Sequence, residues 1–197
     1  MMQRNSRPSA QGGFTLIETM IAMTIMGIGI VALLAAFGAA VNATQNSQEN
    51  LIAREKAQQA LESVYTARNT QQITFSQIAN VASGGIFTNG ATQLLCAGPD
   101  GLVNTSDDVN CPASGPCAAG PECVVLPGPD GILGTADDLP MSLSNFTRSI
   151  QINSTLESDG VTVDPTLKQI VVTITYTVGG NSTPHVYTVT ALISAYR

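Results

Sequence analysis

A long uncharged run dominates the hydrophobic pattern near the N-terminus. Between Phe14 and Val41 the only charged residue is Glu18, and the twenty-three residues that follow it up to Val41 carry no charge. At about 1.5 Å per residue, such a run forms a helix of roughly 35 Å, which is long enough to cross the hydrocarbon core of a bilayer. The pattern therefore predicts a membrane-spanning helix over residues 14–41, with one carboxylate close to its start.

The chain turns polar after residue 41 but keeps the composition of a helix. Residues 42–68 contain neither glycine nor proline, and strong helix formers are frequent among them. Apolar residues at three- and four-residue spacing predict a helix face that packs on a domain: Ala53, Ala57, Ala60, Leu61 and Val64. The charged residues of this stretch are interpreted as a solvated face: Glu49, Arg54, Glu55, Lys56 and Glu62. We expect the helix to continue over residues 42–69, with two helices joined near residues 42–47 as the alternative.

Period-two alternation replaces the helical pattern in the last part of the chain. Apolar and polar residues alternate over three runs between Phe146 and Ile193. Alternation of this kind predicts strands with one buried face, and Gly179-Gly180-Asn181 predicts a hairpin turn between the last two runs. A sheet of three antiparallel strands over residues 145–197 would cover the apolar stripe of the helix. The expected fold class is therefore α+β, with a globular domain over residues 70–197.

A short motif leads into the apolar run: Gly12-Gly13-Phe14-Thr15-Leu16-Ile17-Glu18. An ionisable group inside a membrane span is costly, and by default it indicates a partner that neutralises it. A basic leader, a glycine, an aromatic residue and a glutamate at this spacing resemble the prepilin motif of type IV pilins and type II secretion pseudopilins. The resemblance implies a leader peptide over residues 1–13, cleavage after Gly13 by prepilin peptidase and methylation of the new N-terminus at Phe14. It also implies that Glu18 pairs with the N-terminal amine of a neighbouring subunit during assembly.

Two simpler interpretations of the apolar run are a secretory signal peptide and a plain single-span anchor. A signal peptide would have an apolar region of about 7–15 residues without an acid, whereas this run is longer and contains Glu18. Arg4 and Arg7 precede the span, so under every interpretation the N-terminus is cytoplasmic and the C-terminal domain is periplasmic. The expected location is the inner membrane, crossed once, and then a pilus or pseudopilus filament.

The charge distribution narrows the function classes. Charged residues are 11% of the chain, the net charge is −6, and no Lys or Arg occurs between residues 69 and 147. Duplex binding depends on cationic contacts with phosphate, so nucleic acid is not expected as an obligatory partner. The only histidine, His185, is expected at the surface, and no serine, histidine or aspartate stands in the setting of a nucleophile. We therefore expect no catalytic residues and no enzyme.

A twelve-residue motif occurs twice in the globular domain. Residues 98–109 (the first copy) and residues 128–139 (the second copy) are identical at seven of twelve positions. Each begins with Gly-Pro-Asp-Gly, which favours a tight turn, and each gathers three carboxylates and a threonine hydroxyl. Hard oxygen ligands at this density suit Ca²⁺, and the motif resembles the calcium loops of some major pseudopilins. The candidate ligands are Asp100, Thr105, Asp107 and Asp108 in the first copy, and Asp130, Thr135, Asp137 and Asp138 in the second. Two polar turns with surface aspartates are the alternative.

All four cysteines lie within residues 96–140, the region that contains both copies: Cys96, Cys111, Cys117 and Cys123. Their spacing lacks the C-x₂-C pairs of a zinc ribbon or a redox site, and the expected compartment is oxidising. Four cysteines permit three connectivities. We favour Cys96–Cys111, which would clasp the first copy, together with Cys117–Cys123. Closing a loop of about 15 residues contributes about 3 kcal/mol, so disulfides would stabilise this Gly-, Pro- and Asp-rich region.

These features favour an assembly subunit over other classes of protein. The motif implies a minor pilin or pseudopilin that is processed by prepilin peptidase and assembles with other subunits into a type IV pilus or a type II secretion pseudopilus. The run Ala53–Glu62 is similar to PilV-type minor pilins and GspI-type pseudopilins, which implies a tip or priming position. A calcium-dependent surface adhesin or binding module on a pilin-like stalk is the alternative.

Overall fold

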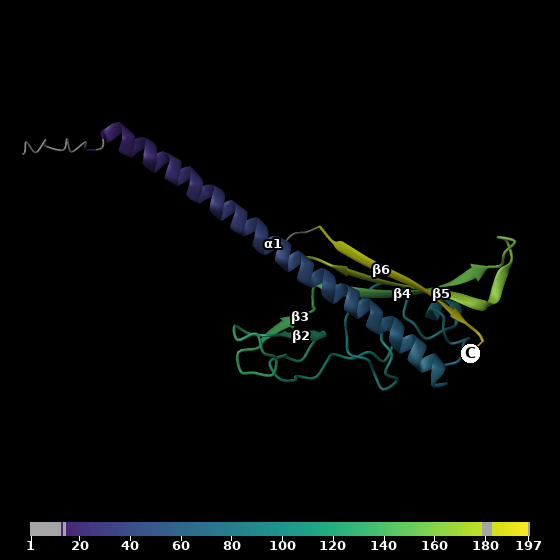
Figure 1. Ribbon diagram of the computed structural model, residues 1–197. Coiled ribbons are helices and arrows are strands. Elements are labelled where there is room, and N and C mark those ends of the chain that lie inside the picture. Colours follow the sequence, from purple (N-terminus) through teal and green to yellow (C-terminus); the bar gives the residue numbers. More distant parts are fainter. Residues whose placement is uncertain (1–12, 14, 179–182, 197) are drawn as a thin grey trace, which may run out of the picture. The chain divides into compact units, whose positions relative to one another are not determined.

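The computed structural model describes residue 13, residues 15–178 and residues 183–196. Phe14, residues 1–12 of the expected leader and the expected turn at residues 179–181 lie outside the described residues. The chain divides into two compact units, Met1–Thr44 and Gln45–Arg197, and each is described by itself. The elements in chain order are α1 (Leu16–Asn69), the 3₁₀ helix η1 (Val81–Ser83), β1 (Thr92–Gln93), β2 (Cys123–Leu126), β3 (Leu139–Ser142), β4 (Phe146–Leu156), β5 (Val163–Tyr176) and β6 (His185–Ser194) (Figure 1).

The helix α1 is continuous from Leu16 to Asn69, which confirms the prediction of one long helix and rules out two separate ones. It contains no proline, and good helix formers (Ala, Gln, Glu, Leu, Arg and Lys) are frequent after position 47. The helix ends where Gln71 adopts a left-handed φ of 64°. The Gln72 N–H then donates back to the Ala67 carbonyl at 2.9 Å, which satisfies a carbonyl that the helix leaves open.

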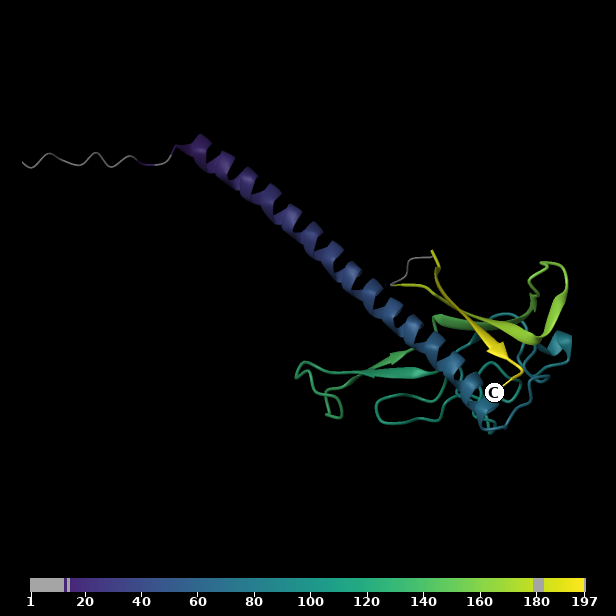
Figure 2. The ribbon, with the colours of Figure 1, turned by 45° about the vertical axis from the view of Figure 1, so that its right-hand side comes forward.

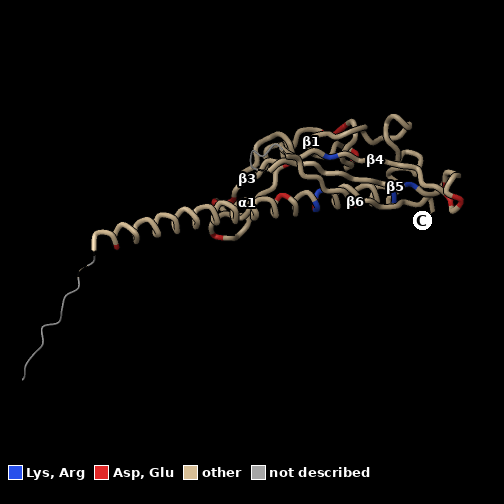
Figure 3. The backbone as a smooth tube through the Cα atoms, turned by 90° about the horizontal axis from the view of Figure 1, so that it is seen from above, with Lys and Arg blue, Asp and Glu red and all other residues tan. Residues whose placement is uncertain are grey.

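In the N-terminal unit, the surface of α1 is apolar and open on all sides. Leu16 is 77% exposed and Phe37 is 68% exposed, and Glu18 is the only charged residue described in this unit (Figure 3). Thr19 and Thr24 donate their hydroxyls to carbonyls of their own helix, each at 2.8 Å, so neither hydroxyl needs water. Within the described part of the chain, α1 is the one helix long and apolar enough to cross a membrane.

In the C-terminal unit, α1 packs its apolar stripe on the sheet. Ala53, Ala57, Ala60 and Val64 are each 0% exposed, as the spacing predicted, and they share one core with the inner face of β5. At the far end of the helix, the Tyr65 hydroxyl donates to the Leu192 carbonyl at 2.7 Å.

The main sheet has four antiparallel strands in the order β1-β4-β5-β6. Its inner face is the predicted one, because Ile170, Val172 and Ile174 are all fully buried. The expected three strands are β4, β5 and β6. The fourth strand, β1, has only two residues and pairs with Arg148 and Thr147, so it was too short to show any alternation.

The strand β6 forms one edge of this sheet. It reads His-Val-Tyr-Thr-Val-Thr-Ala-Leu-Ile-Ser and contains no Asp, Glu, Lys or Arg. Every second residue lies on the half-buried inner face, whereas Val186 and Leu192 are 62% and 54% exposed on the other side.

The segment between α1 and β1 is irregular but well anchored. The Asn80 side chain donates to the Ile150 carbonyl and accepts from the Ile152 N–H, both at 2.8 Å, so it acts like a short strand added beside β4. Lys168 of β5 donates to the carbonyls of Phe75 and Ile78 at 2.9 and 2.8 Å. Apart from η1, these side-chain hydrogen bonds take the place of regular secondary structure in residues 70–90.

The loop region carries its own two-stranded sheet, β2–β3, which lies beside α1 and apart from β5 and β6 (Figure 2). Two disulfides hold this region: Cys96–Cys111 and Cys117–Cys123, which are the pairs that the spacing favoured. The Cys96–Cys111 bridge spans 15 residues and encloses the first copy of the repeat. The α+β class with a disulfide-stapled loop region is thereby confirmed.

Candidate functional site

The start of α1 is organised by Thr15 and Glu18. The Glu18 N–H donates to the Thr15 carbonyl at 3.1 Å and lies 3.4 Å from the Thr15 hydroxyl oxygen. Thr15 is therefore the N-cap and Glu18 the third helical residue, which is the Thr-x-x-Glu spacing of a capping box. Gly13 is exposed just before this cap, and an added Cβ there would meet no atom within 4 Å. The positive end of the helix dipole also stabilises a carboxylate at this position.

The position of Glu18 has a second consequence, because this carboxylate stands at the end of an apolar surface. No Lys, Arg or His occurs among the described residues of the N-terminal unit, so none of these residues supplies Glu18 with a cation. Apolar side chains such as Ile17 and Ile21 flank it and are more than half exposed. Lipid or neighbouring helices would cover such a surface, and a carboxylate buried there is costly unless it is paired or protonated.

One face of this part of α1 carries small residues. A shallow apolar groove follows this part of the helix and is lined by Thr24, Gly27, Ile28, Val31, Ala32 and Ala35. Its glycine and alanines would let another helix approach closely, as small residues do at helix interfaces in membranes.

The first copy of the repeat folds around its own carboxylates. Asp100 accepts from the Leu102 N–H at 2.8 Å, across a turn in which Gly101 has a φ of 69°. Asp107 accepts from the Asp100 N–H at 3.4 Å and packs on Gly98, where a Cβ would lie 2.5 Å from its carboxylate oxygen. The glycines of the motif are therefore required by a positive φ and by a close approach.

The other half of the first copy is closed by Asp108 and Thr105. Asp108 accepts from the Asn104 N–H at 2.7 Å. The Thr105 hydroxyl lies 2.7 Å from an Asp107 oxygen and 3.1 Å from an Asp108 oxygen. All four ligand candidates of this copy thus serve the loop itself.

The second copy repeats this hydrogen bonding. Asp130 accepts from the Ile132 N–H at 2.8 Å, and Asp138 accepts from the Gly134 N–H at 2.7 Å. Asp137 accepts from a threonine hydroxyl at 2.6 Å, as its counterpart does. The motif therefore encodes one local fold twice.

Threonine hydroxyls tune the acids of both copies. The hydrogen bond from Thr105 lowers the pKa of Asp107 below its ordinary value, and that from Thr135 does the same to the pKa of Asp137. Burial raises the pKa of Asp108, although hydrogen bonds oppose this effect. In the first copy, the pKa values of Asp107 and Asp108 are therefore shifted in opposite directions.

The fit of these loops to Ca²⁺ is mixed. Carboxylate, hydroxyl and carbonyl oxygens are the donors that Ca²⁺ prefers. However, the described residues contain no group of three His, Cys, Asp or Glu side chains placed to hold an ion. The carboxylates point instead at the N–H groups and hydroxyls of their own loops. Calcium binding therefore stays a prediction.

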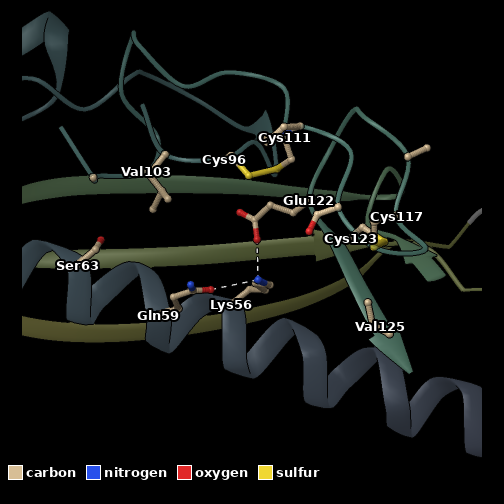
Figure 4. Close-up of a pocket in the computed structure, with 15 residues that line it drawn as sticks. Lys56, Gln59, Ser63, Cys96, Val103, Cys111, Cys117, Glu122, Cys123 and Val125 are labelled. Atoms are coloured by element: carbon tan, nitrogen blue, oxygen red, sulfur yellow. Dashed lines mark hydrogen bonds and ion pairs between the residues drawn. A yellow bond between two sulfur atoms is a disulfide. The ribbon is translucent and has the colours of Figure 1, made fainter. Parts of the chain in front are cut away.

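Sequence reasoning missed a buried ion cluster around Glu122. The Glu122 carboxylate lies 2.6 Å from Lys56 Nζ and 3.4 Å from Arg148 Nη1, and Arg148 is only 1% exposed. Burial lowers the pKa of Arg148, and the charges of Glu122 and Asp108 oppose that shift. Lys56 was assigned to the solvated face but points inward, toward Gln59 and Glu122 (Figure 4). The signal for this cluster in the sequence was Arg148, which is the first Lys or Arg after residue 68.

Lys56 and Glu122 also line a cavity of about 480 Å³ between α1 and the loop region. Lys56 and Gln59 border it on the side of α1, and Glu122 borders it on the loop side, beside the two disulfides (Figure 4). The cavity belongs to the seam that joins the loops to the helix.

Glu49 is a second correction to the solvated face. It is only 9% exposed, and its Oε2 has no hydrogen-bond partner. Burial raises its pKa, and the charge of His185 partly offsets this. His185 itself is exposed, as expected, and it stacks on Tyr176 at 5.4 Å between ring centroids.

Comparison with known protein families bears on the N-terminal segment. Residues 8–34 match the family model described as the prokaryotic N-terminal methylation motif. Neither the curated proteins nor the solved structures gave a match to this chain. The matched motif is the signature of type IV pilins and pseudopilins, and the long helix on an antiparallel sheet fits the type IV pilin superfamily.

The motif therefore supports a type IV pilin-like protein that is processed by prepilin peptidase, and it implies assembly with other pilins. Together with the exposed apolar half of α1, it indicates a protein anchored in the inner membrane.

Proposed function

We propose that this chain is a minor pilin or pseudopilin subunit, cut after Gly13, methylated at Phe14 and built into a type IV pilus or a type II secretion pseudopilus. In this role it crosses the inner membrane once, with its globular unit in the periplasm, and occupies a tip or priming position. The alanine-rich run Ala53–Glu62, which resembles PilV-type and GspI-type subunits, supports the minor role. The chain acts through assembly rather than catalysis.

One observation carries this proposal: Glu18 stands in the first turn of an exposed apolar helix, and the described residues of its unit include no Lys, Arg or His. In a filament core the carboxylate would be buried, and the N-terminal amine of a neighbouring subunit would neutralise it. A buried charge is tolerated only when such a partner is present.

The test separates two roles of Glu18, helix capping and charge pairing. Glutamine serves as well as glutamate at the third position of a capping box. Glu18→Gln should therefore leave the helix start and membrane insertion intact but lower incorporation into filaments at least tenfold. The matched variant Thr15→Ala weakens the cap and keeps the charge, so it should be incorporated almost normally. The measurement is the ratio of subunit in sheared filaments to subunit in membranes.

Two results would count against the pairing role. Normal incorporation of Glu18→Gln would show that the charge is not needed, and equal losses in Glu18→Gln and Thr15→Ala would assign Glu18 to capping. Mass spectrometry of the same samples tests processing, since Gly13→Leu should retain the leader whereas both other variants should lose it.

A second candidate is a calcium-dependent binding module displayed on the pilin-like helix. The second copy of the repeat favours it, because its acids are largely exposed and one oxygen of Asp138 has no donor. Calorimetric titration of the full chain in detergent should show calcium binding that the double variant Asp137→Asn/Asp138→Asn loses. Equal melting temperatures in EDTA and in calcium would sink this candidate.

A further inference from the structure

The two copies of the repeat share one loop fold but differ in what covers their apolar residues. In the first copy Leu102 is 1% exposed and belongs to the main core. At the equivalent position in the second copy, Ile132 is 60% exposed, and so is its neighbour Leu133. The local fold is the same, so the difference lies in the surroundings and not in the loop.

The first copy shows how this loop docks. Leu102 enters the core, Val103 packs against it, and Asn104 is fully buried. The Asn104 amide donates to Thr88, and its carbonyl oxygen accepts from Thr92 at 3.0 Å. A cation stands behind the loop, because Asp108 interacts electrostatically with the buried Arg148.

The second copy lies at the end of the β2–β3 hairpin, where the described residues leave Ile132 and Leu133 uncovered. Gly134 replaces the anchoring asparagine, so the loop carries no residue that would bind a neighbouring strand in cis. Thr135 donates to the Ile132 carbonyl at 3.0 Å, whereas its counterpart in the first copy reaches Asp108. One oxygen of Asp138 is consequently shielded from solvent and has no donor.

We propose that the second copy, residues 128–139, is a docking loop that inserts Ile132 and Leu133 into an apolar socket on a different protein subunit, with a Lys or Arg of that subunit beside Asp138. The first copy, docked in its own chain, is the template for this contact. The inference goes beyond the proposed function, because it gives the globular unit an interface of its own, separate from α1.

The negative charge of the second copy indicates which kind of partner can bind it. The loop carries Asp130, Asp137 and Asp138, and no Lys or Arg occurs between residues 69 and 147. An anionic membrane surface would repel three carboxylates, so a lipid does not fit. Another molecule of this chain fits poorly too, since its net charge is −6 and the socket of this kind that it forms is filled by its own Leu102. A more basic subunit has the required chemistry.

The experiment uses in-cell photo-crosslinking of the full chain, with benzoylphenylalanine as the probe. The template places Val103, the counterpart of Leu133, against the core, whereas Ser106, the counterpart of Ala136, faces solvent. A probe at position 133 should therefore give a strong adduct with another subunit, and a probe at position 136 a weak one. Val161, 82% exposed on the turn between β4 and β5, is the control for general stickiness.

Variants then test the contact itself. With the probe at position 133, Ile132→Ser should lower the adduct yield at least tenfold. Asp138→Asn keeps the loop shape but should lower the yield several-fold and remove its salt dependence. Because Ile132 is exposed and an asparagine at position 138 can still accept from the Gly134 N–H, the melting temperature and the two disulfides should be unchanged. Mass spectrometry should map the adduct to apolar residues of the partner that adjoin a Lys or Arg.

Four outcomes would overturn the proposal. These are equal adducts at positions 133, 136 and 161, adducts with lipid only, adducts with another molecule of this chain, and adducts that disappear in EDTA. The last would assign the loop to the calcium candidate instead. A normal Glu18→Gln phenotype combined with the expected adduct would leave the docking loop standing while the proposed function failed.

Discussion

Single charged side chains hold separate parts of the C-terminal unit together. Arg148 and Glu122 join β4 to the loop region, and Lys56 adds α1 to the same cluster. Lys168 ties β5 to the irregular segment after α1. A chain with so few charges, 11% of its residues, uses several of them inside.

Glu49 supplies a pH-dependent prediction at this scale. Its pKa is raised by burial, so its contribution to stability is present below the ordinary carboxyl pKa and is lost as the pH rises through the folded-state pKa. At neutral pH the charged form costs stability. Glu49→Gln should therefore raise the free energy of unfolding at pH 7.5 by about 1 kcal/mol, and the gain should vanish near pH 4. Urea unfolding at both pH values measures this.

The exposed residue Glu62 on the same helix is the matched control. Glu62→Gln should change the free energy of unfolding by less than about 0.5 kcal/mol at either pH. A gain for Glu49→Gln that stays constant between pH 4 and pH 7.5 would contradict the role assigned to its ionisation.

Residue-scale features were the hardest to predict from sequence. The face of β5 followed from alternation, and the stripe of α1 followed from its spacing, because burial sets both patterns locally. The pairing of Arg148 with Glu122 did not, because it joins segments that are 26 residues apart and depends on where the loops fold back. Likewise, the repeat predicted two equal loops but could not show that only one of them is covered.

At the scale of elements, the contact of α1 with the sheet depends on alanine. Ala57 is fully buried on the stripe, whereas its neighbour Gln58 is exposed. A larger side chain at position 57 would push the helix away from β5, since close-packed cores resist added volume.

Ala57→Leu should therefore lower the free energy of unfolding by about 1–3 kcal/mol. Gln58→Leu adds a leucine one position away on the outer face and should leave it nearly unchanged. Chemical denaturation of the detergent-solubilised chain compares the two. Equal effects of the two substitutions would mean that the stripe does not pack as described.

At the scale of the whole molecule, the two units need different surroundings. The apolar part of α1 in the N-terminal unit suits lipid or other helices, whereas the C-terminal unit has a core of its own. The loop region contributes little to that core. Between residues 95 and 142, all of which are described, Leu102 is the one fully buried apolar side chain.

The loop region should accordingly depend on its disulfides. Cys96→Ser/Cys111→Ser opens a bridge that spans 15 residues and should cost about 3 kcal/mol. Cys117→Ser/Cys123→Ser opens one that spans 6 residues and should cost about 2 kcal/mol. Denaturant unfolding of each variant measures the loss in the free energy of unfolding. A larger loss for the shorter bridge would show that chain entropy does not govern the stabilisation.

The exposed edge of β6 limits how much unassembled protein can accumulate without aggregating. Its ten uncharged residues, rich in valine and threonine, offer unpaired backbone groups to any extended chain nearby. Crowded molecules waiting in the membrane would tend to join through this edge into insoluble aggregates. We expect the cell to tolerate only a small standing pool of this subunit, so overproduction without its assembly machinery should yield precipitate and not a reserve.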